Sequence, residues 1–173
     1  ASWYLLKDPN CTILVISATS NKAAEFISMT RNILRLVPYC ECLRPGDHTT
    51  DNAFSFNVEA RTKLGQDKSC FARGITSQLT GSHADHVIAD DVEIEGNCET
   101  ASSRTKLMNK ISEFEQIRNV GGRVIFLGTP QIKDSIYNQL KSGYPVTKFP
   151  AVMPDKSNPV EMEDVNEWVE QLS

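Results

Sequence analysis

The feature that most constrains the fold is an apolar run at 12–17, which leads directly into an amphipathic helix. The run is rich in β-branched residues, as is typical of a strand buried on both faces of a parallel sheet. A helix is predicted over 20–37, where Ser20 can cap the start and Pro38 ends the pattern. Its apolar side chains share one face: Ala23, Phe26, Ile27, Ile33, Leu34 and Val37.

Strands and helices continue to alternate along the chain. A half-exposed strand at 54–58 is expected to pair antiparallel with 69–75. Buried strands are predicted at 86–89 and 123–127, helices at 100–119 and 133–141, a final strand at 146–149, and an amphipathic helix after Asn158-Pro159. Gly121-Gly122 are expected to end the longer helix. The predicted fold class is α/β, with a mostly parallel sheet flanked by helices.

Composition excludes several classes of protein. Of the 173 residues, 40% are hydrophobic and 23% are charged, which suits one ordinary core. No apolar run exceeds four residues, so the sequence predicts no membrane span. The net charge of −4 argues against a free-standing nucleic-acid binder, although it allows contact with DNA through a local patch. The five cysteines match no zinc spacing and indicate reduced thiols in a cytosolic protein.

Three predicted strands end in small polar or acidic residues. These ends are Ser17-Ala18-Thr19-Ser20, Asp90-Asp91 and Gly128-Thr129-Pro130-Gln131. Because ligands of parallel sheets bind beyond the carboxyl ends of the strands, the three ends are expected to form one site.

The acidic pair suits magnesium, which takes one or two carboxylates and otherwise waters and phosphate oxygens. Asp90 is then expected to hold the hydrated metal, and Asp91 to polarise an attacking water. Glu93 and Glu95 either share this role or are simply solvated. The alternative is that the pair only caps the following turn. Gly128-Thr129-Pro130 is likewise either a plain turn or a rigid mount that holds a hydroxyl for phosphate.

Four ordered segments together closely resemble the ATPase domain of the large terminase subunit of short-tailed double-stranded DNA phages. These segments are 13–18, 74–85, 87–93 and 126–131, of which 74–93 is the most specific. The resemblance implies an additional-strand, RecA-like P-loop NTPase fold that uses Mg²⁺ and ATP. Asp90 takes the Walker B magnesium role, and Asp91 takes the catalytic carboxylate position, with Glu93 as a second candidate. Gly128, Thr129, Pro130 and Gln131 form the coupling motif that senses the γ-phosphate.

The resemblance also implies how the protein is organised and what it meets. Residues 1–150 are expected to be a partial ATPase domain. Residues 151–173 are its end, or a linker toward a nuclease domain. The implied partners are double-stranded DNA, the portal protein, the small terminase subunit and further copies in a ring, with no membrane. The implied location is the host bacterial cytoplasm and, transiently, the procapsid portal.

The chain departs from the family pattern in two places. A P-loop, G-x-x-x-x-G-K-[ST], is expected before the 13–17 strand, yet the 173 residues contain none. Residues 3–9 resemble the tail of the helix that follows such a loop, so the loop is expected before Ala1 and the truncated chain is expected to be inactive alone. His83 stands where relatives commonly carry Arg, which leaves His83 and Arg73 as candidates for a trans-acting cation. His83 and His86 are otherwise plain loop and strand-end residues.

Two other functions remain open from the sequence. The first is lobe one of a superfamily 2 helicase, but Asp90-Asp91-Val92-Glu93 does not match the acidic tetrad of that class. The second is a non-catalytic scaffold or oligomerisation module without a P-loop.

Overall fold

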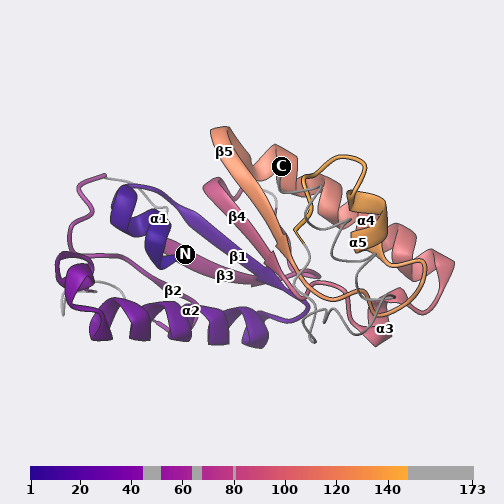
Figure 1. Cartoon of the computed structure of the whole chain (residues 1–173), viewed down its shortest axis with the longest axis horizontal. Helices are drawn as coiled ribbons and strands as arrows, with labels where there is room; N and C mark the ends of the chain where they lie inside the picture. Colours follow the sequence, from indigo (N-terminus) through magenta and orange to yellow (C-terminus); the bar gives the residue numbers. More distant parts are fainter. Residues whose placement is uncertain (45–51, 64–67, 80, 148–173) are drawn as a thin grey trace, which may run out of the picture.

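Within residues 1–44, 52–63, 68–79 and 81–147, which the computed structural model describes, five strands form one sheet in the order β2-β3-β1-β4-β5 (Figure 1). The strands are β1 Ile13–Ser17, β2 Ser55–Phe56, β3 Cys70–Gly74, β4 Ala84–Asp90 and β5 Arg118–Leu127. β1 is parallel to both β3 and β4, and β5 is parallel to β4. Only β2 among these strands runs antiparallel, against β3. The predicted α/β class and the antiparallel pairing are confirmed.

Alternating side chains of the central strands separate the core into two layers. On one face, Ile13 and Val15 pack with Ala23, Ile27 and Leu34 of helix α2 (Ser20–Leu36). This layer also receives α1 (Ser2–Lys7) and the 3₁₀ helix η1 (Pro38–Leu43). Since β1 is fully buried, it needs a helix layer on each face, as its unbroken apolar sequence predicts.

On the opposite face, Leu14 and Ile16 pack with an apolar stripe of helix α4 (Ala101–Ile117). The stripe consists of Leu107, Ile111, Phe114 and Ile117. The short helices α3 (Glu95–Cys98) and α5 (Ile136–Leu140) lie on the same side of the sheet as α4 (Figure 1). The predicted helices over 20–37, 100–119 and 133–141 are therefore confirmed within a few residues.

The prediction that two glycines end the helix before β5 is wrong. Gly121 and Gly122 were expected to end the preceding helix, but α4 ends at Ile117 and both glycines lie within β5. Gly121 has a φ of +81°, and a Cβ at Gly122 would overlap the carbonyl oxygen of Asp85 on β4. The glycines thus allow an irregular start to the pairing of β5 with β4, where the register shifts between Ala84 and His86.

Other predictions differ in extent. β5 is half-exposed rather than buried, because in the described residues it has a strand neighbour on one side only. The strand predicted at 54–58 shortens to β2. Beyond β2, Asn57 Oδ1 accepts the N–H of Ser69, and the N–H of Val58 donates to the Ser69 hydroxyl, so side chains replace the backbone pairing there. Residues 146–147 belong to no strand, and residues 148–149 and the helix after Asn158-Pro159 lie outside the described residues. Among the helices that the structure describes, none is long and apolar enough to cross a membrane.

Candidate functional site at the carboxyl edge of the sheet

The ends of four neighbouring strands lie in one row. Ser17 at the end of β1 is the register partner of Gly74 on β3 and of Asp90 on β4. Asp90 is in turn the register partner of Leu127, the last residue of β5. Since β1, β3, β4 and β5 are parallel, the polar segments that follow them leave the sheet along the same edge. The predicted convergence of the three strand ends is confirmed.

The exit of β1 is tied to the exit of β3. The Thr19 hydroxyl accepts the N–H of Lys22 at 3.2 Å and caps α2, a role that the sequence had suggested for Ser20. Ser20 Oγ instead accepts the N–H of Gly74 at 3.1 Å. A Cβ at Gly74 would lie 2.8 Å from the nitrogen of Ser20, so only glycine permits this approach.

Asp90 and Asp91 have different surroundings although they are adjacent. Asp90 is partly buried, and its pKa is raised by that burial and by the negative charge of Asp91, while Lys22 opposes the shift. Asp91 is exposed and has a φ of +45°, which turns the chain as it leaves β4. Its N–H donates to the carbonyl oxygen of Leu127 at 2.9 Å. The acidic pair is therefore held against the end of β5.

The segment 128–131 continues from Leu127 and so begins beside the acidic pair. Thr129 and Pro130 are exposed. Gly128 is packed against the phenol of Tyr137 on α5, where a Cβ would overlap the ring. The Tyr137 hydroxyl donates to the carbonyl oxygen of Leu127 at 3.3 Å, and burial is the main reason that its pKa rises to about 12. The first residue of the segment is thus fixed between β5 and α5.

Glu93 lies in a different environment from the acidic pair. Its side chain is 1% exposed, and its carboxylate accepts the N–H groups of Gln131 at 3.1 Å and Ile136 at 2.8 Å. This burial does not favour the catalytic role that the sequence suggested for it beside Asp91. Ser20 belongs to one of the three predicted strand ends. Its hydrogen bond to Gly74 and the packing of Tyr137 on Gly128 were not predicted, because they depend on how the segments pack against one another.

The acidic pair fits magnesium better than it fits a metal held by protein groups alone. In the described ranges, no three His, Cys, Asp or Glu side chains gather into a metal cage. Asp90 with its neighbour Asp91 offers two carboxylates at the open edge, which is the number that Mg²⁺ usually takes from a protein. Water and ligand oxygens would fill the remaining coordination positions of such an ion.

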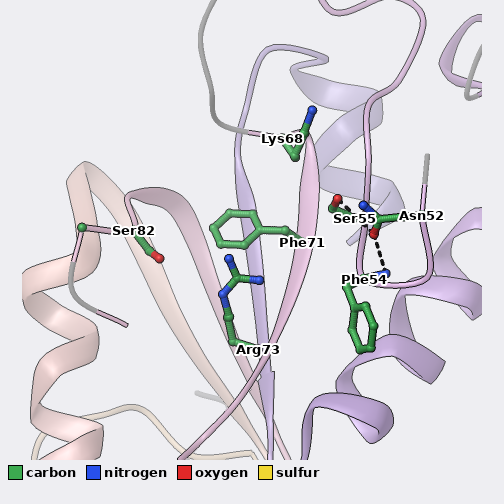
Figure 2. Close-up of a pocket in the computed structure, with 8 residues that line it drawn as sticks. Asn52, Phe54, Ser55, Lys68, Phe71, Arg73 and Ser82 are labelled. Atoms are coloured by element: carbon green, nitrogen blue, oxygen red, sulfur yellow. Dashed lines mark hydrogen bonds between the residues drawn. The ribbon is translucent and has the colours of Figure 1, made fainter. Parts of the chain in front are cut away.

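The two predicted trans-acting cations do not join this edge within the chain. His83 directly precedes β4, so the length of that strand separates it from Asp90 by about 23 Å. Arg73 lies one residue before the end of β3, but the central carbon of its guanidinium is 5.6 Å from the ring centroid of Phe71. Figure 2 shows these two side chains next to each other. His83 and Arg73 are both exposed. Arg73 belongs to a separate pocket, which is lined by Asn52, Phe54, Ser55, Lys68, Phe71, Arg73, Gly81 and Ser82 (Figure 2).

The fold and this edge define an α/β protein of the class that binds ligands beyond the carboxyl ends of parallel strands, with an acidic pair at the site. No protein-family model matches the chain. The chain is 38% identical over 156 residues to the large subunit of terminase from Enterobacteria phage T3, which covers 88% of the chain and 26% of that protein. The chain therefore belongs to the large terminase subunits, and it spans about a quarter of the length of this relative. The resemblance that the motifs indicated is confirmed.

Proposed function

We propose that these residues are the nucleotide-hydrolysing core of a phage DNA-packaging motor that drives double-stranded DNA into a procapsid. The relation to the phage T3 terminase supports the packaging role. The observation that carries the hydrolytic role is the register of Asp90 between Ser17 and Leu127, which sets the acidic pair beside the segment 128–131. A parallel sheet with this edge is also compatible with the additional-strand P-loop fold.

In this proposal Asp90 holds the hydrated Mg²⁺ and Asp91 polarises the attacking water. Mg²⁺, when bound, neutralises charge on the phosphates of ATP. Residues 128–131, the coupling segment, sense the γ-phosphate through Thr129. Gly128, which packs against Tyr137, and the conformationally restricted Pro130 hold Thr129 outside the core. A P-loop from outside these residues is needed to bind the phosphates, because the chain contains no such motif. His83 and Arg73 remain candidates for contact with a neighbouring copy.

The same proposal extends to the partners and the place of action. Double-stranded DNA, the portal protein, the small terminase subunit and a ring of identical copies are the expected partners. The procapsid portal in the host cytoplasm is the expected place of action, and a nuclease domain is expected in the longer protein.

The test is ATP hydrolysis by the full-length protein with double-stranded DNA. We expect Asp91→Asn to lower kcat by about 10²–10⁴-fold, because the neutral amide cannot polarise the water. The Kd of ATP should stay nearly unchanged. Asp90→Asn should instead raise the Mg²⁺ concentration needed for nucleotide binding.

Asp134→Asn is the matched control, since Asp134 is exposed and pairs only loosely with Arg104 at 3.8 Å. Wild-type turnover in both the Asp90 and the Asp91 variant would contradict the proposed function.

A further inference from the structure

The Glu93 carboxylate is buried where the chain leaves the acidic pair. It follows Asp91 by two residues, and its neighbour Val92 is fully buried. A buried carboxylate is unfavourable unless hydrogen bonds replace the water that it loses. Here each oxygen accepts one main-chain N–H group, so the hydrogen bonds compensate the charge at both ends of the carboxylate.

The two donors come from different parts of the chain after β5. Gln131 is the last residue of the coupling segment, and Ile136 is the first residue of α5. Their N–H groups meet Oε1 and Oε2 of the same carboxylate at 3.1 Å and 2.8 Å. One side chain therefore joins the exit of β4 to both ends of the loop 131–136.

A second contact fixes the other end of the coupling segment. Tyr137, the residue after Ile136, covers Gly128 and donates its hydroxyl proton to the carbonyl oxygen of Leu127. The coupling segment is thus anchored at Gly128 through Tyr137 and at Gln131 through Glu93, while Thr129 and Pro130 between them are exposed. Thr129 is therefore flanked by one anchor on α5 and one anchor at the exit of β4.

We propose that Glu93 is a positioning residue that holds the coupling segment and α5 to the strand carrying Asp90 and Asp91. Because this carboxylate bonds to both, the coupling segment and α5 move together when the γ-phosphate is lost. This inference rests on the proposed function, and it assigns Glu93 to mechanical coupling rather than to the chemical step.

The first test is amide hydrogen exchange in the 173-residue chain carrying Glu93→Gln. The glutamine keeps one acceptor oxygen and replaces the other with NH₂, so one of the two N–H groups loses its acceptor. We expect exchange at Gln131 or Ile136 to accelerate by about 10- to 100-fold, while exchange in the central strand β1 stays unchanged. Unchanged exchange at both amides would overturn the proposal.

Two further variants show whether faster exchange comes from the lost hydrogen bonds of Glu93, from the lost negative charge or from a loss of folding. Glu95→Gln is the matched control. Glu95 is exposed on α3, and its substitution removes the same negative charge two residues away from Glu93. Glu93→Asp keeps the charge but is one methylene too short to reach both donors. It should accelerate exchange at one of the two amides, and it keeps the test decisive if Glu93→Gln does not fold.

The second test is the length of DNA moved per ATP hydrolysed by the full-length protein. Glu93→Gln should reduce this ratio while the KM of ATP and the hydrolysis rate without DNA stay close to wild type. A collapse of DNA-independent hydrolysis as large as that of Asp91→Asn would overturn the positioning role. If the wild-type protein hydrolyses no ATP, the proposed function and the coupling role both fail, but the exchange result still shows the contact.

Discussion

Asp90 and Asp91 are adjacent but differ in how far their carboxylates are buried. Asp90 is partly buried beside another negative charge, so its carboxylate form is disfavoured before a metal binds. A cation at this position relieves that repulsion. In the proposed function, a divalent cation held by Asp90 would therefore relieve an unfavourable interaction that is present in the metal-free protein.

The burial of the charged Asp90 carboxylate, together with its repulsion by Asp91, predicts that Asp90→Asn stabilises the metal-free protein. Because the folded-state pKa of Asp90 is raised, the destabilisation is present in full above that pKa and disappears as the pH falls below the unfolded value of about 3.9. Solvent screens the partly exposed group, so the increase in Tm at pH 7 should be below about 2 °C.

Thermal unfolding in EDTA, measured from pH 3 to pH 7, checks this prediction. Asp134→Asn should show no such pH-dependent gain. A lower Tm for Asp90→Asn than for the wild type at pH 7 would contradict it.

Only some of the site residues could be placed at the site from the sequence alone. Asp90, Asp91 and Thr129 follow apolar strands directly, so their place at the edge could be predicted once the strands were taken as parallel. The buried state of Glu93 could not, because its hydrogen-bond donors lie 38 and 43 residues away. The contact of Arg73 with Phe71 is by contrast local, because residues two apart on a strand lie on the same face.

The helix α2 depends on its first turn for its place at the site. Thr19 caps the helix, and Ser20 next to it bonds to β3, so two neighbouring hydroxyls perform different tasks. Sequence patterns locate such a helix start within a residue or two. They do not decide which hydroxyl is the cap, because that depends on the position of Gly74.

We expect Thr19→Ala to lower the free energy of unfolding by about 0.5–2 kcal/mol, because the N–H of Lys22 loses its acceptor. Thr105→Ala is the control, since Thr105 is exposed within α4 and its hydroxyl only returns to the carbonyl oxygen of Ala101. The control should change stability by less than about 0.5 kcal/mol. Urea unfolding of both variants measures the difference, and equal losses would argue against the assignment of Thr19 as the cap.

The start of β5 shows where element prediction fails. A pair of glycines after an amphipathic stripe usually ends a helix, yet here α4 ends four residues earlier at Ile117. Asn119 donates to Asp85 at 2.9 Å, and Gly122 lets the two backbones approach. These contacts with β4 draw the segment into the sheet, and a local pattern contains no information about them.

For the molecule as a whole, the two helix layers place the acidic pair at an edge that is open to a ligand. The sheet supplies Asp90, Asp91 and the coupling segment, but the 173 residues contain no glycine-rich loop with a lysine to hold phosphates. Under the proposed function, the phosphates of ATP would therefore need donors from outside these residues.

Accordingly, we expect the 173-residue chain alone to bind ATP with a Kd of about 1 mM or weaker, even with Mg²⁺, and not to hydrolyse it. Titration of a fluorescent ATP analogue measures this affinity, with the full-length protein as the positive control. Micromolar affinity of the 173-residue chain would contradict the expectation.

The sequence was sufficient for the main alternation of strands and helices, the parallel sheet and the acidic pair at its edge, because burial imposes local periods of two and 3.6 residues on the side chains. Tertiary structure alone decided the roles of Glu93, Ser20 and Tyr137 and the start of β5. Each of these depends on hydrogen bonds or close packing between segments far apart in the chain, and such contacts exist only once the sheet has brought those segments together.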